Sequence, residues 1–198
     1  MCTDVMDIYQ VVTRRRSIRK YKADMVPKPL ILRVLAAANW APSGMNEQPW
    51  EFAVVAGEKL AALQRVCKEV IDVRMPPETR TEEQKEFAKW YGTLGGAPLA
   101  IIQICNRETD AGRRKMVLES MAASFQNLLL AATAEHLGTC WMTGPLLKEQ
   151  DILALFALPA TKEIAALTPL GYPDESPRPV PRKDAELAQK VLWFDVEE

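Results

Sequence analysis

Apolar residues recur at helical spacing, three or four positions apart, in several segments of this chain. Thr3 or Asp4 can cap a first helix that runs to about Thr13. A second helix is predicted to open near residues 27–29, because prolines are tolerated in a first turn, and to end before Pro42. Further helices are predicted over Glu58–Val73, Lys148–Phe156 and Asp184–Lys190.

The longest predicted helix, Arg113–Leu137, is rich in alanine and leucine and is expected to stop with Gly138 in the C′ position. Its second half is apolar nearly all round. That pattern predicts burial on several sides, either at the centre of the fold or at a subunit interface.

Shorter apolar runs predict strands between these helices. They are Trp50–Val55, Leu99–Cys105, Thr139–Met142 and Ile164–Leu170. Helices and strands interleave without a regular βαβ repeat and without internal repetition, so the predicted fold class is α+β. The sequence contains neither G-x-G-x-x-G nor a P-loop, so neither of these nucleotide-binding signatures is available.

The segment from Arg74 to Gly96 differs in character from its surroundings. Pro76-Pro77 and three glycines bracket a charged amphipathic stretch over Thr81–Tyr91. Such a segment can be a mobile lid or a plain surface excursion, and the pattern leaves both open. Trp90 and Tyr91 could cover a substrate, although an amphipathic surface helix would also turn aromatic residues inward.

Composition supports an ordinary globular protein, with 48% hydrophobic and 26% charged residues among 198, and favours one domain over residues 1–198. Twenty-five basic and 26 acidic side chains nearly balance, which opposes a nucleic-acid binder. No apolar run reaches the ~20 residues of a membrane span, and the N-terminus does not resemble a signal peptide. We therefore expect a cytoplasmic protein. Four scattered cysteines predict no metal site, and Cys67 and Cys105 are expected to be buried thiols.

Against this neutral background, six of the nine residues from Arg14 to Lys22 are basic. Arg15-Arg16-Ser17 offers charged and neutral donors suited to a phosphate, although a run of charge is also typical of a solvated face. Pro42–Trp50 is a loop whose small residues and amide permit close approach to a planar polar ring. Near the other end, five prolines between Pro169 and Pro181 predict a stiff arm that presents Arg182-Lys183.

Four motifs in this order resemble the FMN-dependent nitroreductase superfamily, over a stretch from about Met6 to Lys190. They are R-R-S-I-R-K-Y at Arg15–Tyr21, A-P-S-G-M-N-E-Q-P-W at Ala41–Trp50, L-G-T-C-W at Leu137–Trp141 and G-Y-P…P-R-K at Gly171–Lys183. The resemblance implies an α-β-α sandwich with a central mixed or antiparallel sheet. It also implies a homodimer with swapped termini, in which the long helix forms much of the interface and the tail Val191–Phe194 can pair with the partner's sheet.

The resemblance also implies roles for residues at matching positions. Arg15, Arg16 and Ser17 would hold the phosphate and ribityl chain of FMN, and Arg19 would reach the N1–C2=O edge of its ring. The partner subunit would contribute Pro42, Ser43, Gly44, Met45 and Asn46. Thr143 and Gly144 would offer backbone N–H groups near N5 and O4, with Thr143 standing where many relatives have glycine. Arg182 and Lys183 would return to the phosphate.

The implied activity is an NAD(P)H-dependent FMN oxidoreductase that transfers hydride by a ping-pong cycle to nitroaromatic, quinone or similar electron-poor acceptors. The flavin carries that chemistry, so no catalytic side chain is required. The single histidine, His136, is better explained by the dipole of the long helix. Two alternatives remain open: a dehalogenase or flavin-cleaving enzyme on the same scaffold, and a non-catalytic flavin-binding protein.

Overall fold

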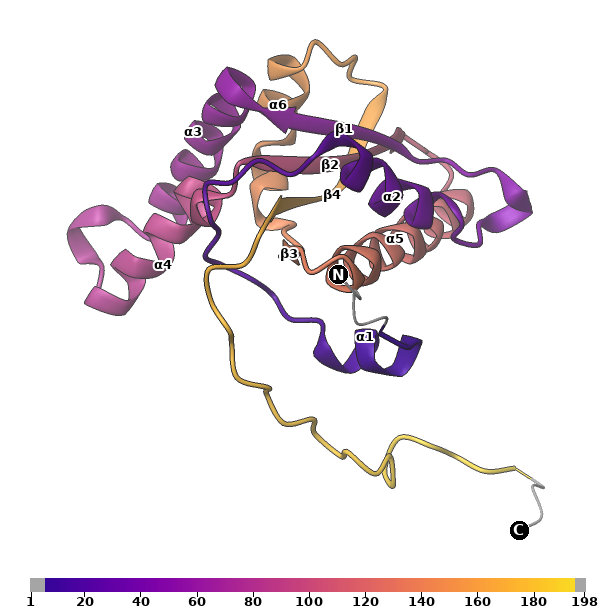
Figure 1. Cartoon of the computed structure of the whole chain (residues 1–198). Helices are drawn as coiled ribbons and strands as arrows, with labels where there is room; N and C mark the ends of the chain where they lie inside the picture. The colour runs from indigo at the N-terminus through magenta and orange to yellow at the C-terminus, as the bar shows by residue number, and fades with distance from the viewer. Residues whose placement is uncertain (1–5, 195–198) are drawn as a thin grey trace.

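The computed structural model describes residues 6–194, in which one antiparallel sheet separates two layers of helices (Figure 1). The strands are β1 (Glu51–Ala56), β2 (Leu99–Asn106), β3 (Gly138–Thr139) and β4 (Lys162–Gly171), in the order β1-β2-β4-β3. All three strand pairs are antiparallel, and the β2–β4 register shifts between Gln103 and Ile104. The predicted α+β class is therefore confirmed, and of the two predicted sheet types the structure has the antiparallel one.

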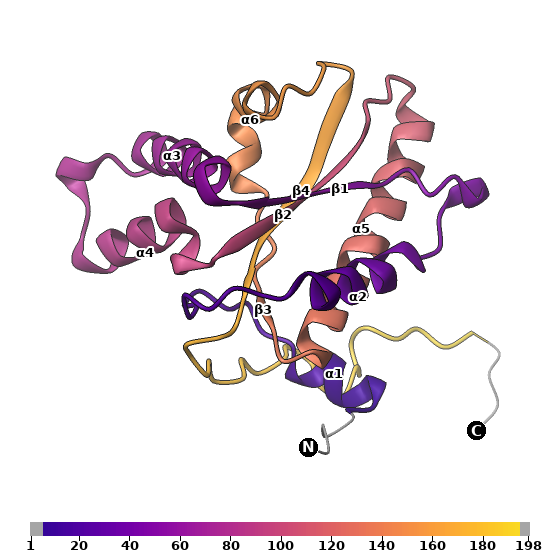
Figure 2. The same ribbon diagram turned by 45° about the horizontal axis from the view of Figure 1, so that its top comes forward.

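The alternation of side chains along β2 explains the two helical layers. Ala100, Ile102 and Ile104 pack with α3 (Gly57–Arg74), α4 (Glu82–Thr93) and α6 (Glu149–Leu155) on one face. Leu99 and Ile101 pack with α2 (Lys28–Asn39) and α5 (Ala111–Ala134) on the other face. Figure 2 shows the same division, with the sheet between the two groups of helices. Because every side chain from Leu99 to Cys105 is buried, the continuous apolar run of β2 marks the centre of the fold.

Short 3-10 turns complete the connections between these elements. They are η1 (Gly44–Asn46), η2 (Pro77–Thr79), η3 (Leu94–Gly96) and η4 (Gly144–Lys148).

The first helix begins later than the sequence predicts. Helix α1 (Ile8–Arg14) is capped by Asp7, whose side chain accepts from the Gln10 backbone while the Gln10 side chain accepts from the Asp7 backbone. This reciprocal capping box satisfies the exposed N–H groups of the first turn. The earlier cap candidates, Thr3 and Asp4, lie outside the described residues.

The long helix ends before the glycine that was expected to stop it. Helix α5 ends at Ala134, and His136 takes the left-handed C′ position with φ 57°. The N–H groups of His136 and Leu137 donate to the carbonyls of Thr133 and Ala132. Because histidine tolerates positive φ better than most residues, it can replace glycine in this Schellman motif. Gly138 instead begins β3.

The predicted helix over Asp184–Lys190 is wrong, because the structure has only turns there, with positive φ at Asp184 and Leu187. Leu187 is 51% exposed, so no packing rewards a helix this short. Beyond it, the side chains of Leu192, Trp193 and Phe194 are exposed. Their pairing with a partner's sheet stays a prediction.

Cys67 and Cys105 are free and buried, as expected, and so is Cys140. Burial raises the pKa of the Cys67 thiol to about 12 and, with a smaller contribution from nearby Glu163, that of Cys105 to about 11. Over residues 6–194, no helix is both long and apolar enough to span a membrane.

Candidate functional site

The basic segment leaves α1 and runs between β3 and the start of the C-terminal arm. Ser17 forms a parallel bridge with Thr139, and the N–H of Ile18 donates to the Thr139 carbonyl over 2.8 Å. Farther along, the Lys22 N–H donates to the Tyr172 carbonyl over 2.9 Å. These backbone bonds place the segment beside β3, so its cations are fixed against the core.

An arginine groove of about 500 Å³ opens between this segment and the arm. Its cationic lining comprises Arg15, Arg16, Arg19, Arg178 and Arg182, with Ser17 among them. Within the described part of the chain, none of the lining residues carries a carboxylate. The groove therefore concentrates positive charge without internal neutralisation, which favours an anionic ligand.

The arginines of the groove lie close enough to perturb one another. Burial lowers the pKa of the Arg15 guanidinium, and the neighbouring charges of Arg16 and Arg182 lower it further. Two hydrogen bonds hold Arg16, which donates to the carbonyls of Thr13 (2.6 Å) and Arg15 (2.7 Å). Keeping like charges together has a free-energy cost that a bound phosphate would offset.

Of the two cations predicted at the end of the arm, Arg182 lines the groove and Lys183 does not. The groove also includes Arg178, which the sequence reasoning missed although it lies in the same proline-rich arm. Glu175 was missed as well. Its carboxylate accepts from the backbone N–H groups of Arg19 and Lys20, and so ties the arm to the basic segment.

The position of Arg182 predicts different effects for two adjacent cations. If the groove holds the FMN that the sequence motifs imply, Arg182→Ala should weaken its binding at least fivefold, because a charge-assisted contact contributes roughly 1.5–3 kcal/mol. Lys183→Ala should change the dissociation constant less than twofold. Fluorescence titration of the two apoproteins with FMN measures both values, and equal losses would contradict the assignment.

Arg19 connects the groove to the segment over residues 74–96. Its guanidinium carbon lies 5.2 Å from the centre of the Trp90 ring, a cation–π arrangement. Trp90 belongs to an aromatic trio with Phe87 and Tyr91, whose ring centres are 5.2–6.0 Å apart. This part of α4 thus lies beside Arg19, which also lines the arginine groove.

Thr143 and Gly144 lie at the start of η4, four and five residues after Thr139. Thr143 is exposed and Gly144 is half-buried. A Cβ added to Gly144 would lie 2.2 Å from the Tyr91 hydroxyl oxygen and 3.5 Å from Arg74 Nη1. The turn therefore packs against the aromatic trio, which in turn contacts Arg19.

The loop with Pro42, Ser43, Gly44, Met45 and Asn46 lies elsewhere. The Gly44 N–H donates to Ser120 Oγ on α5 over 3.1 Å, and Met45 and Asn46 have positive φ on the surface. In Figure 2 the connection between α2 and β1 projects at the right-hand edge of the molecule, away from β3 near the centre. One chain does not bring this loop to its own arginine groove, so its contribution to a partner's site stays a prediction.

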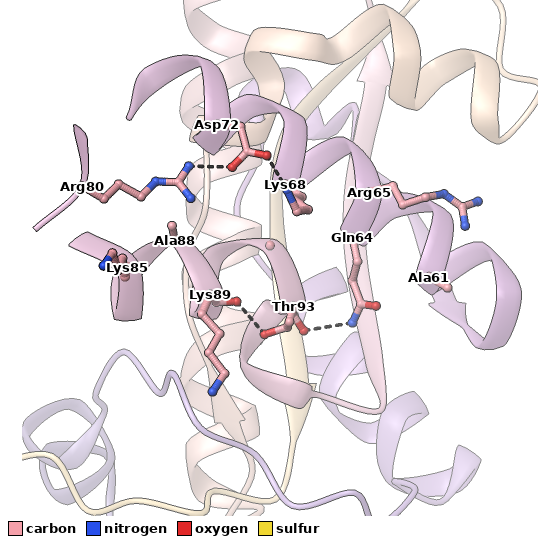
Figure 3. Close-up of a pocket in the computed structure, with 11 residues that line it drawn as sticks. Ala61, Gln64, Arg65, Lys68, Asp72, Arg80, Lys85, Ala88, Lys89 and Thr93 are labelled. Carbon is pink, nitrogen blue, oxygen red and sulfur yellow. Dashed lines mark hydrogen bonds and ion pairs between the residues drawn. The ribbon is translucent and has the colours of Figure 1, made fainter. Parts of the chain in front are cut away.

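A second groove, of about 410 Å³, lies between α3 and α4 (Figure 3). Its cations are largely paired: Asp72 accepts from both Arg80 and Lys68, with N···O distances of 2.5 Å. Arg65 also lines this groove, but its guanidinium extends away from α4. Positive charge in this groove is therefore partly neutralised by Asp72, whereas the described lining of the arginine groove has no carboxylate.

Fold and groove together define a class: an α+β protein with helices on both faces of an antiparallel sheet and a cationic groove suited to an anionic ligand. Residues 12–172 match the sequence profile of the Nitroreductase family. The chain belongs to the nitroreductase family.

Individual relatives agree with this assignment. A Methanothermobacter thermautotrophicus protein, named for NADH dehydrogenase and NAD(P)H nitroreductase activity, is 34% identical over 87% of this chain and 80% of its own. The FMN and NADPH-dependent nitroreductase NfnB from Sphigopyxis sp. strain HMH has a TM-score of 0.82 at 21% identity, covering 96% and 100% of the two chains. Iodotyrosine deiodinase bound to FMN and 3-iodo-L-tyrosine has a TM-score of 0.76 at 25% identity, with the same coverage.

Proposed function

We propose that this nitroreductase-family enzyme binds FMN in the arginine groove, oxidises NADH or NADPH, and reduces nitroaromatic, quinone or similar electron-poor acceptors. The observation that carries the proposal is the convergence of Arg15, Arg16 and Arg182 in a groove whose described lining has no carboxylate. A phosphate would supply the negative charge that such a groove lacks. FMN and NAD(P)H appear in the names of the similar proteins.

The arginine groove fits FMN through its chemistry and its position. Arg15, Arg16, Ser17 and Arg182 would hold the phosphate and ribityl chain. Arg19, which lines the same groove and lies over the Trp90 ring, would reach the ring edge. The Thr143–Gly144 turn lies beyond Tyr91, where its backbone N–H groups would face the reactive edge of the ring.

When bound, FMN supplies the hydride chemistry, accepting hydride from the nicotinamide and passing it to the acceptor. The residues of the chain would bind FMN, orient its ring and tune its reduction potential. Arg19 would stabilise the negative charge that reduction leaves at the N1–C2=O edge, and its contact with the Trp90 ring would help to orient the guanidinium. The residues Pro42–Asn46 would complete the site of a second subunit in a homodimer.

Steady-state oxidation of NADH and NADPH, with menadione and nitrofurazone as acceptors, tests the proposed function. We expect turnover with at least one donor and one acceptor, by a ping-pong rate law, and none from the FMN-free protein. A yellow protein that passes hydride to no acceptor would instead be a flavin-binding protein without this activity.

A dehalogenase is the second candidate, because the chain covers the full length of an iodotyrosine deiodinase structure at 25% identity. Release of iodide from 3-iodo-L-tyrosine by the reduced protein would support it. If menadione reoxidises the reduced flavin faster than 3-iodo-L-tyrosine does, the result would favour the nitroaromatic or quinone reductase.

Arg19→Ala should keep FMN bound but lower its midpoint potential by about 30 mV or more. For a two-electron couple, 30 mV corresponds to ~1.4 kcal/mol, which is within the range of a charge-assisted contact. Spectroelectrochemical titration measures the shift, with Lys20→Ala as the matched control because Lys20 is exposed and does not line the groove. An unchanged potential in Arg19→Ala would remove the tuning role.

A further inference from the structure

The hydroxyl of Tyr91 is buried without a hydrogen-bond partner among the described residues. Tyr91 as a whole is 6% exposed. Burial raises the pKa of this hydroxyl, with the Arg74 charge acting in the opposite direction, so the group stays protonated and able to donate. A buried hydroxyl that makes no bond is costly, and such groups in folded proteins call for an explanation.

The surroundings of this hydroxyl are rich in donors. The Tyr91 oxygen and Arg74 Nη1 both lie against Gly144, at 2.2 Å and 3.5 Å from the position that its Cβ would occupy. The indole Nε1 of neighbouring Trp90 is also buried without a partner in the described chain. Arg74 is exposed, at the C-terminal end of α3, and forms no ion pair with any described residue.

Two separate positive regions therefore flank the aromatic trio. The arginine groove, with Arg19 stacked on Trp90, lies at one end. Arg74 lies at the other end, beside the Thr143–Gly144 turn. The first region is satisfied by the FMN phosphate and ring edge in the proposed function. The second has no assigned ligand.

We propose that Arg74 is a specificity-determining residue that binds an anionic oxygen of the oxidising substrate at the Thr143–Gly144 turn, and that Tyr91 is the positioning residue that holds it there through its free hydroxyl. The inference rests on the proposed function and names its preferred acceptors: aromatic compounds that carry a carboxylate or a comparable anionic group. The tyrosine oxygen can accept a hydrogen bond from the guanidinium and so orient Arg74 toward the ligand.

Ligand binding to the holoprotein tests this subsite without turnover. Benzoate and benzamide have nearly the same shape and differ in charge, and neither is reduced. We expect benzoate to perturb the visible flavin spectrum with a dissociation constant at least fivefold lower than that of benzamide. Arg74→Gln should bring the ratio of the two constants close to one, and Tyr91→Phe should reduce it at least twofold.

Arg65→Gln is the matched control, because Arg65 is another exposed arginine of α3 whose side chain points away from α4 (Figure 3). It should leave the ratio unchanged. A purely structural role for Arg74 or Tyr91 would lower the thermal midpoint without changing the preference for benzoate. The inference is overturned if the wild-type protein binds benzoate and benzamide with nearly equal dissociation constants. It is also overturned if the folded Arg74→Gln holoprotein keeps the wild-type ratio of these two constants.

Kinetics with 4-nitrobenzoate and 4-nitrobenzamide separate this inference from the proposed function. Arg74→Gln should raise KM for 4-nitrobenzoate at least fivefold and leave KM for 4-nitrobenzamide and for NADH or NADPH unchanged. A rise in KM for the nicotinamide donor alone would assign Arg74 to the donor's phosphates and overturn the inference. Absence of any NAD(P)H oxidation would reject the proposed function, while the benzoate titration would still report on the subsite.

Discussion

Replacing Arg15 with alanine is expected to weaken FMN binding at least tenfold. Arg15 is half-buried between Arg16 and Arg182, and burial together with these two charges lowers its pKa. Its contact with a phosphate would be charge-assisted and partly shielded from water. Such contacts contribute roughly 1.5–3 kcal/mol, and 1.4 kcal/mol already corresponds to a factor of ten. Titration of apoprotein with FMN, followed by the loss of flavin fluorescence, gives the two dissociation constants.

Lys22→Ala is the matched control for this experiment. Lys22 belongs to the same basic run but is exposed and does not line the groove. Its removal should change the FMN dissociation constant less than twofold at physiological ionic strength, because exposed charges at a distance are screened. If Arg15→Ala binds FMN as tightly as the wild type, the basic run is only a solvated face. Equal losses in both variants would indicate a general field effect and not a contact.

Local sequence patterns predicted most of the core elements because the residues that are buried there are also the ones that form the apolar runs and stripes in the sequence. The apolar run over Leu99–Cys105 became the central strand, and the stripe along Glu58–Val73 became α3 with only its ends displaced by one residue. Asp184–Lys190 also has a helix-like pattern, but nothing packs against it, so the pattern alone does not produce a helix. At the end of α5 either His136 or Gly138 could have taken the C′ position. Gly138 pairs with Gly171 in the sheet, and His136 is the residue that ends the helix.

The candidate site was predictable to the extent that it consists of sequence neighbours. Arg15, Arg16, Ser17 and Arg19 form one continuous run, and Arg182 follows a recognisable proline-rich arm. Glu175 gave no such signal, and the aromatic pattern around Tyr91 indicated only that it could cover a substrate or pack inward. Their importance comes from contacts with residues far away in the sequence: the Arg19 backbone for Glu175, and Gly144 for Tyr91. Only the folded chain shows that the segment over residues 74–96 reaches the site.

Gly95→Ala is expected to lower the free energy of unfolding by about 2–5 kcal/mol and to weaken FMN binding severalfold. Gly95 has a φ of 67°, and a Cβ there would lie 2.3 Å from the carbonyl oxygen of Arg19. Its own carbonyl accepts from the Tyr21 N–H over 3.1 Å. Positive φ costs an alanine roughly 1–2 kcal/mol, and the overlap adds a cost typical of overpacking, about 1–3 kcal/mol. The backbone around Arg19 must shift, which would also disturb the neighbouring Arg16 and Ser17, the residues proposed to hold the FMN phosphate and ribityl chain.

Gly57→Ala separates the two contributions. Gly57 has a φ of 57°, but a Cβ there would meet nothing within 4 Å. The variant should therefore lose only the conformational term, about 1–2 kcal/mol, and should bind FMN like the wild type. Urea unfolding at one protein concentration, together with FMN titration, measures both effects for both variants. If Gly95→Ala is no less stable than Gly57→Ala and keeps its FMN affinity, the close contact between Gly95 and Arg19 does not hold the basic segment in place.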